Sequence, residues 1–155
     1  MRPIALSLAT ALLVAACGGT SATSSPSPTQ TASASPTPAP TIVAKLTTDA
    51  KLGKILVDSA TGKTLYTWAK DTDENSQCYD QCATFWPPLV TTAKTVAADG
   101  VTAGKFGTSA RKDGAQQVTF NGHPLYLYAN DKAPGETKGQ GSTGFGAVWV
   151  VVPAQ

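Results

Sequence analysis

Cysteine and histidine, the residues best suited to bind transition metals, are scarce: the 155 residues include three Cys and one His. Cys78 and Cys82 stand close together, whereas His123 lies far along the chain. In an oxidising compartment the two cysteines form a structural disulfide, whose small ring stabilises a fold by about 2 kcal/mol. We predict this disulfide and expect no cofactor. The alternative is an exported copper or redox protein, because two soft thiolates and His123 would suit Cu(I).

A second candidate site is a motif, Tyr-x-aromatic-x-x-Asp, that occurs twice at an offset of 60 residues. Its residues are Tyr66, Trp68 and Asp71 in the first copy and Tyr126, Tyr128 and Asp131 in the second. Side chains two positions apart share one face of a strand. We expect the aromatic pairs to pack in the core and each Asp to accept hydrogen bonds from turn N–H groups. The alternative is a duplicated shallow site for a sugar or a cation.

Catalytic groups are harder to find. A Ser-His-Asp triad would depend on His123, and no Gly-x-Ser-x-Gly elbow presents a serine nucleophile. Asp71 and Asp131 could belong to a carboxylate pair for glycoside hydrolysis, but their separation in space does not follow from the sequence. We therefore expect no enzyme, with a wall-polysaccharide hydrolase as the alternative.

Short β-elements must position these residues. Strands are predicted at 55–57, 64–68, 117–120 and 125–128, and a strand buried on both faces at 147–152. Asn121-Gly122 between two of them predicts a type I′ hairpin turn. A short helix is expected near 82–86, stopped by Pro87-Pro88. Residues 91–114 predict a loop with a short strand around Lys105 and Phe106.

The offset of 60 residues also pairs Phe85 with Phe145, so the repeat extends beyond the motif. The sequence therefore predicts an all-β fold in which two homologous β-rich halves form one small domain. We place this domain at 42–155, with repeats at about 52–90 and 110–152.

The N-terminus predicts export. Residues 4–16 are apolar apart from Ser7 and Thr10, a run too short to span about 30 Å of hydrocarbon but long enough for a signal-peptide core. Val14-Ala15-Ala16-Cys17 resembles the lipobox of bacterial lipoproteins, in which the cysteine receives diacylglycerol and becomes the first mature residue. We therefore predict a signal peptide at 1–16, a lipidated Cys17 and attachment to the extracytoplasmic face of a bacterial membrane.

The segment after Cys17 has an unusual composition. Residues 20–40 consist of Ser, Thr, Pro, Ala and a single Gln, so this stretch cannot bury enough apolar surface to fold. We predict a disordered tether at 17–41. The net charge of the chain is only +2, with 14% charged residues. Such a balance argues against a nucleic-acid partner, which requires clustered Lys and Arg.

Together, the two motif copies behind a lipobox resemble the predicted lipoproteins with a Yx(F/W/Y)xxD motif, a family also described as secreted repeats of unknown function. Further segments fit this resemblance: Cys78-x-x-x-Cys82 before Trp86-Pro87-Pro88-Leu89, the run from Asn121 to Tyr126, and Gly144-Phe145-Gly146. Asp80 departs from it, because the family often has Gly there. The resemblance implies an extracytoplasmic envelope protein without an established activity. We predict a non-enzymatic binding or structural module with an envelope protein or a glycan as partner.

Overall fold

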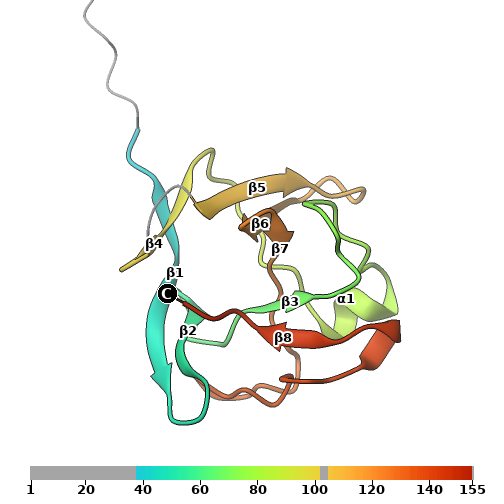
Figure 1. Cartoon of the computed structure of the whole chain (residues 1–155). Helices are drawn as coiled ribbons and strands as arrows, with labels where there is room; N and C mark the ends of the chain where they lie inside the picture. Colours follow the sequence, from blue (N-terminus) through green and yellow to red (C-terminus); the bar gives the residue numbers. More distant parts are fainter. Residues whose placement is uncertain (1–37, 102–104, 155) are drawn as a thin grey trace, which may run out of the picture. The chain divides into compact units, whose positions relative to one another are not determined.

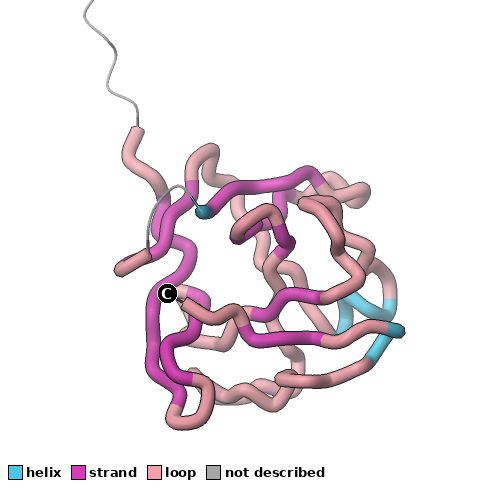
Figure 2. Tube along the Cα trace, viewed as in Figure 1, coloured by secondary structure: helices cyan, strands magenta, loops and turns pink. Residues whose placement is uncertain are grey.

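The computed structural model describes residues 38–101 and 105–154. The predicted signal peptide, Cys17 and nearly all of the predicted tether lie outside these residues. Strands dominate the described part, accompanied by one short helix, α1 (Gln81–Phe85), and one 3-10 turn, η2 (Gly144–Gly146) (Figures 1 and 2). This content confirms the predicted all-β fold, and α1 confirms the short helix expected before Pro87.

The strands are short and succeed one another closely along the chain. They are β1 (Thr41–Asp49), β2 (Gly53–Asp58), β3 (Tyr66–Trp68), β4 (Val96–Asp99), β5 (Phe106–Ala110), β6 (Gln116–Phe120), β7 (His123–Pro124) and β8 (Trp149–Val151). They form three sheets with the orders β2-β1-β4, β3-β8 and β5-β6-β7. All strand pairs are antiparallel except β1 with β4.

Turn chemistry closes the hairpins. Asp49 Oδ1 accepts hydrogen bonds from the backbone N–H groups of Lys51 and Leu52, both at 2.8 Å, an Asx turn that joins β1 to β2. Asn121 and Gly122 take φ values of 52° and 79°. Positive φ at both central residues is the requirement of a type I′ turn, which confirms the hairpin predicted between β6 and β7.

Three expectations about the strands were wrong. Residues 91–114 contain β5, which confirms the short strand expected around Phe106, but they also contain β4, where a loop was expected. Val148 is exposed and Val150 is half-buried, so the last strand is not buried on both faces. Leu125 to Tyr128 form only isolated bridges through Tyr126. β4 is short and pairs in parallel with β1, and such a long-range pairing leaves no local signal in the sequence.

The two repeats exchange their last segments. β3 of the first repeat pairs with β8 of the second. Reciprocally, Pro88 of the first repeat forms a bridge with Tyr126 of the second, and Val90 forms one with Gln117. Each repeat is therefore completed by the end of the other.

Two closed rings of backbone hydrogen bonds show this exchange residue by residue. In one ring, Leu56 N–H donates to Val152 O, Val152 N–H to Leu65 O, and Leu65 N–H to Leu56 O. The same ring forms in the second repeat, where Val118, Leu89 and Leu125 take the places of Leu56, Val152 and Leu65. In each ring two members come from one repeat and the third from the other.

The structure also corrects the register of the repeat. Ala129 N–H donates to Phe85 O, and Ala69 N–H donates to Val148 O, both at 2.9 Å. The counterpart of Phe85 is therefore Val148, and Phe145 is not an equivalent position. The offset of 60 fails here because the second copy has the longer loop: 18 positions separate Asp131 from Trp149, against 15 between Asp71 and Trp86.

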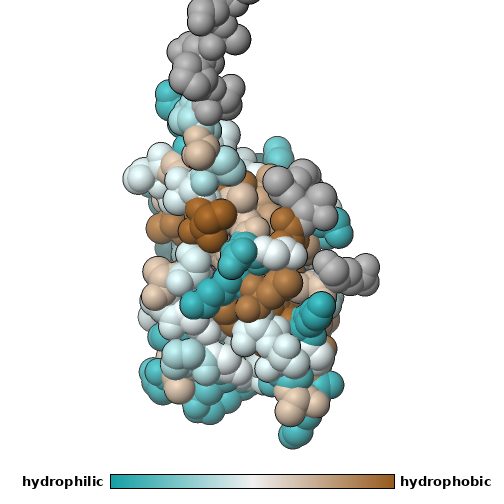
Figure 3. All heavy atoms as spheres, turned by 90° about the vertical axis from the view of Figure 1, so that its left-hand side faces the viewer, coloured by the Kyte–Doolittle hydropathy of each residue, from teal (hydrophilic) through white to brown (hydrophobic). Residues whose placement is uncertain are grey.

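Buried side chains form two clusters. One is aliphatic and includes Leu56, Leu65, Val118 and Leu125, whereas the other is aromatic and holds the disulfide cysteines. In the view that faces β1 and β2, hydrophobic atoms gather in patches between hydrophilic ones (Figure 3). On β1 itself, Ile42 is 48% exposed.

Candidate functional site

Tyr66 and Tyr126 lie at the centre of the candidate site. The backbone N–H of each tyrosine donates to the carbonyl oxygen of the other, both at 2.9 Å. Their side chains then cross between the repeats: Tyr66 Oη donates to Asp131 Oδ2 at 2.6 Å, and Tyr126 Oη donates to Asp71 Oδ2 at 2.5 Å. The tyrosine of each motif copy therefore binds the aspartate of the other copy.

The remaining carboxylate oxygens accept backbone N–H groups. Asp71 Oδ1 accepts from Gln77 at 2.8 Å, and Asp131 Oδ1 accepts from Lys138 at 3.0 Å. Both aspartates are buried. Burial raises the pKa of each carboxyl, although the tyrosine and backbone donors oppose this shift. Burial and the neighbouring carboxylate also raise the pKa values of Tyr66 and Tyr126, so both hydroxyls remain protonated donors.

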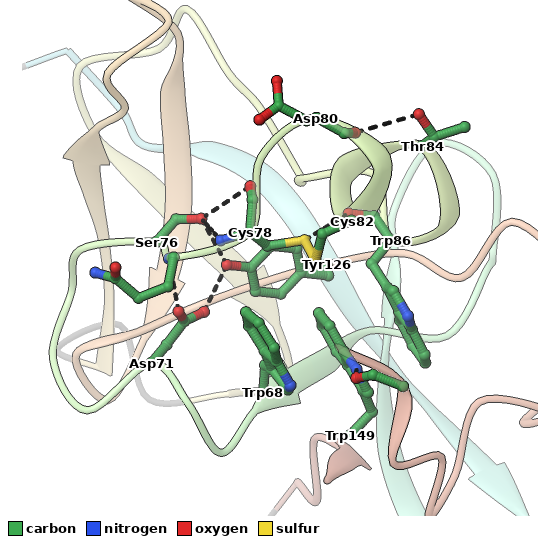
Figure 4. Close-up of a disulfide and its surroundings, with 12 residues drawn as sticks. Trp68, Asp71, Ser76, Cys78, Asp80, Cys82, Thr84, Trp86, Tyr126 and Trp149 are labelled. Atoms are coloured by element: carbon green, nitrogen blue, oxygen red, sulfur yellow. Dashed lines mark hydrogen bonds between the residues drawn. A yellow bond between two sulfur atoms is a disulfide. The ribbon is translucent and has the colours of Figure 1, made fainter. Parts of the chain in front are cut away.

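The other motif aromatics belong to a column of four stacked rings, Trp68–Trp149–Trp86–Tyr128. Ring centroids are 4.8 Å apart between Trp68 and Trp149, 3.9 Å between Trp149 and Trp86, and 4.2 Å between Trp86 and Tyr128. Figure 4 shows the three tryptophans side by side next to the disulfide. The column is symmetric in sequence terms, because the motif aromatic of each repeat stacks on the tryptophan of the other. Such stacking adds about 0.5–1.5 kcal/mol per pair beyond area burial.

Asp71 is connected to further side chains. Tyr126 Oη lies 2.8 Å from Ser76 Oγ, and since its single hydrogen goes to Asp71, the serine hydroxyl donates to the tyrosine. Arg111, which is buried, donates to Ser76 Oγ at 2.9 Å and to the carbonyl oxygen of Cys78 at 3.0 Å. Its guanidinium also pairs with Asp113 at 2.9 Å. Sequence reasoning missed Arg111, because it lies in the segment expected to be a loop and belongs to no motif.

Cys78 and Cys82 form the predicted disulfide, with an S–S distance of 1.98 Å and Cα atoms 5.2 Å apart. The bridge ties the segment before α1 to the helix itself. Asp80, inside this ring, has a φ of 52°. This backbone region favours glycine, so the turn keeps its geometry at the cost of local strain.

The disulfide leaves no free thiolate for the copper alternative. His123 is exposed, and its Nδ1 lies 3.0 Å from the carbonyl oxygen of Asp71. Within residues 38–101 and 105–154, no three His, Cys, Asp or Glu side chains gather in a group that could hold a metal ion. Copper binding by the reduced protein stays the untested alternative.

Around Asp131 the second copy uses backbone in place of side chains. Gly139 N–H donates to Tyr66 Oη at 3.3 Å, the place that Ser76 takes beside Tyr126. A Cβ atom on Gly139 would lie 2.7 Å from Trp86 and 3.0 Å from Tyr66. Glycine is therefore required where this loop crosses the aromatic column.

The geometry favours a packed core over a duplicated surface site for the motif. Asp71 and Asp131 are 1% and 0% exposed, and each already holds two hydrogen-bond donors. A carboxylate in this state can neither attack a sugar nor activate a water without unfolding its surroundings. Sequence reasoning placed the motif aromatics in the core and gave each Asp backbone N–H donors, but it missed the exchange between repeats, because no periodicity records which copy a side chain will contact.

A family model described as a secreted repeat of unknown function matches residues 46–90 and 107–153. No curated protein and no solved structure matches the chain. None of the helices in the described part of the chain has the length and hydropathy of a membrane span.

Proposed function

Because the chain belongs to the secreted repeats of unknown function, we propose that it is a lipid-anchored protein of the bacterial envelope that binds an envelope partner without chemical turnover. The proposal that the protein binds without chemical turnover is supported by the burial of the duplicated motif. Both Asp71 and Asp131 are buried and hydrogen-bonded to a tyrosine of the other repeat. The most distinctive polar groups of the repeat thus hold the domain together.

A binding or structural role fits this use of the residues. The cysteines close a small ring, and Arg111 is buried among Ser76, Gln117 and Cys78. The motif aspartates and the cysteine pair are therefore engaged in the fold. The outer surface of the loops is left for function, on a scaffold fixed by the exchanged strands.

Anchoring rests on Val14-Ala15-Ala16-Cys17, with its small residues before a cysteine. Each buried CH₂ of an acyl chain contributes about 0.8 kcal/mol, so two or three chains on Cys17 hold a protein at the membrane where one would not. The Ser/Thr/Pro-rich stretch at 20–40 then separates the domain from the bilayer.

Anchoring is tested with the full chain in a bacterial host fed a radiolabelled fatty acid. We expect label on the wild-type protein, and recovery of that protein with the membrane fraction. Cys17→Ala should lose the label and leave the membrane fraction, whereas Cys82→Ser, the matched cysteine control, should keep both. A labelled Cys17→Ala protein would contradict the proposal.

Binding without turnover is tested by mixing the purified protein with isolated cell-wall material. We expect the protein to sediment with the wall and to release no new reducing ends. Release of reducing ends that disappears in a variant of one carboxylate would support the hydrolase alternative. A protein that neither sediments with wall material nor retains any envelope protein would contradict a binding role.

A further inference from the structure

One concave site on the described surface is lined largely by aromatic rings. It is a pocket of about 200 Å³, formed by Phe85, Trp86, Tyr128, Ser142, Gly144 and Phe145. Phe85 and Phe145 remain 42% and 39% exposed, with ring centroids 6.1 Å apart and planes tilted by 44°. Drug-sized ligands occupy about 300–1,000 Å³, so this pocket fits a single small ring.

Phe145 is held in place by an unfavourable backbone. Its φ is 66°, a value that is an outlier for a bulky side chain. Such strain concentrates at functional positions, where the surroundings enforce it. Phe145 also lies in the loop that is longer in the second copy, and the counterpart of Phe85 is Val148, so the aromatic pair of Phe85 and Phe145 is not duplicated by the repeat.

The loop that carries Phe145 is held in place by hydrogen bonds. Trp149 Nε1 donates to Gly144 O at 2.9 Å, and Gly144 N–H donates to Ser142 Oγ at 3.4 Å. Trp149 is itself stacked on Trp86, which is one of the residues that line the pocket. The two exposed rings therefore stand on a rigid base and need little reordering to receive a ligand.

The chemistry of the lining selects the ligand. None of its residues is charged, but Ser142 contributes a hydroxyl and Tyr128 Oη accepts a hydrogen bond from Asn130 Nδ2 at 3.1 Å. A ligand that fits has an apolar face for the rings, polar groups at its edge and no net charge. Pyranose sugars match, because their C–H bonds pack against the negative face of an aromatic ring while their hydroxyls point outward.

We propose that this pocket binds a neutral pyranose unit of an envelope glycan, stacked on Phe85 and Phe145. This inference rests on the proposed binding function and names its site and ligand class.

The test uses the full chain purified from the host envelope and titrated by calorimetry with triacetylchitotriose and cellotriose. A charged oligogalacturonide is the comparison ligand. Phe145→Gly removes the ring and relieves the positive φ, so it should lower the affinity at least tenfold while leaving the melting temperature unchanged or raised. Phe85→Ala should also weaken binding. Ile42→Ala, which removes a similarly exposed apolar side chain from β1, should change neither quantity.

Several outcomes would overturn the proposal. They are no binding of either neutral sugar, stronger binding of the charged one, or unchanged affinity in Phe145→Gly. A dimer that dissociates on Phe145→Gly would assign the rings to self-association, and loss of liposome binding would assign them to the bilayer. If Phe145→Gly still sediments with wall material, this pocket is wrong but the binding function stands. If the wild-type protein itself does not sediment with wall material, the binding function fails.

Discussion

The two repeats use the same contacts at their centre and different ones around it. Tyr66 and Tyr126 bind each other's aspartate, and Trp86 and Trp149 stack on each other. Outside this centre, the Tyr126–Asp71 pair is supported by the side chains of Ser76 and Arg111. The Tyr66–Asp131 pair is supported instead by the backbone N–H groups of Lys138 and Gly139. The duplicated residues therefore hold the repeats together, and the loops are where the copies have diverged.

This difference separates residues that maintain the fold from residues free to serve a function. A change at the centre affects both repeats at once, because each contact there spans the two copies. A change in one loop affects only its own side. The single-copy features, the disulfide with α1 and the exposed Phe145, are where a specific role can be carried without disturbing the shared centre.

The largest expected effect comes from separating the repeats. A fragment of residues 38–101 lacks the strand that pairs with β3, and a fragment of residues 105–155 lacks the segment that pairs with Tyr126. We expect each fragment alone to be unfolded, with no cooperative transition by circular dichroism. Mixed or co-expressed, the two should form a folded one-to-one complex. A single repeat that folds cooperatively would show that the exchanged strands are not required.

Next in size is a pair of matched substitutions, Asp71→Asn and Asp131→Asn. In Asp71→Asn the new amide can donate to Tyr126, whose hydrogen then passes to Ser76 Oγ, so the tyrosine hydroxyl keeps both partners. In Asp131→Asn the Tyr66 hydroxyl receives the amide and Gly139 N–H and has no acceptor left, at a cost of about 2–3 kcal/mol. We expect Asp71→Asn to cost about 1 kcal/mol.

Urea denaturation of the two variants side by side measures this asymmetry. Equal losses would show that Ser76 and Arg111 do not support Asp71 as the contacts indicate. A larger loss for Asp71→Asn would reverse the comparison.

The disulfide gives a smaller effect confined to the first repeat. Replacing both cysteines by serine should lower the free energy of unfolding by about 2 kcal/mol, since the ring is short. Because α1 lies in the loop of the first repeat, protection of backbone N–H groups against hydrogen exchange should fall for residues 77–86. It should stay the same for residues 137–148. Hydrogen exchange by mass spectrometry checks this, and an equal loss in both loops would contradict the proposed independence of the loops.

The smallest effect is on pH dependence. Asp71 and Asp131 have pKa values raised by burial above the unfolded value of about 3.9. Between the unfolded and folded pKa the native state binds more protons, so stability falls as pH rises through that window and is flat above it. Acidification from neutral pH toward about 4 should therefore increase stability slightly.

Glu136, which is half-buried, acts in the opposite direction at lower pH. Its hydrogen bonds to Lys138 and to backbone N–H groups lower its pKa to about 2, so its contribution is lost as pH falls from about 4.3. Urea titrations from pH 7 to 4 test the prediction. The gain should vanish when both aspartates are replaced by asparagine, and a steady loss of wild-type stability over this range would contradict it.

Local chemistry made part of this structure predictable. The Asn121-Gly122 turn, the short helix before Pro87 and the pairing of Cys78 with Cys82 all depend on neighbouring residues. The parallel pairing of β4, the exchange of strands and the burial of Arg111 depend on residues far apart in the chain. Two nearly identical motifs also offer two alternative partners for each aspartate, and only packing decides between them.

The exchange of strands has a consequence for the order of events during export. β3 has no partner until β8 is available, and the ring through Leu56 and Leu65 needs Val152. A chain that crosses a membrane with its N-terminus leading therefore cannot complete even its first repeat while its last residues remain inside. Domains that depend on contacts between residues far apart in the chain also fold slowly. For a chain exported unfolded, the domain therefore assembles only after nearly its whole length has passed through.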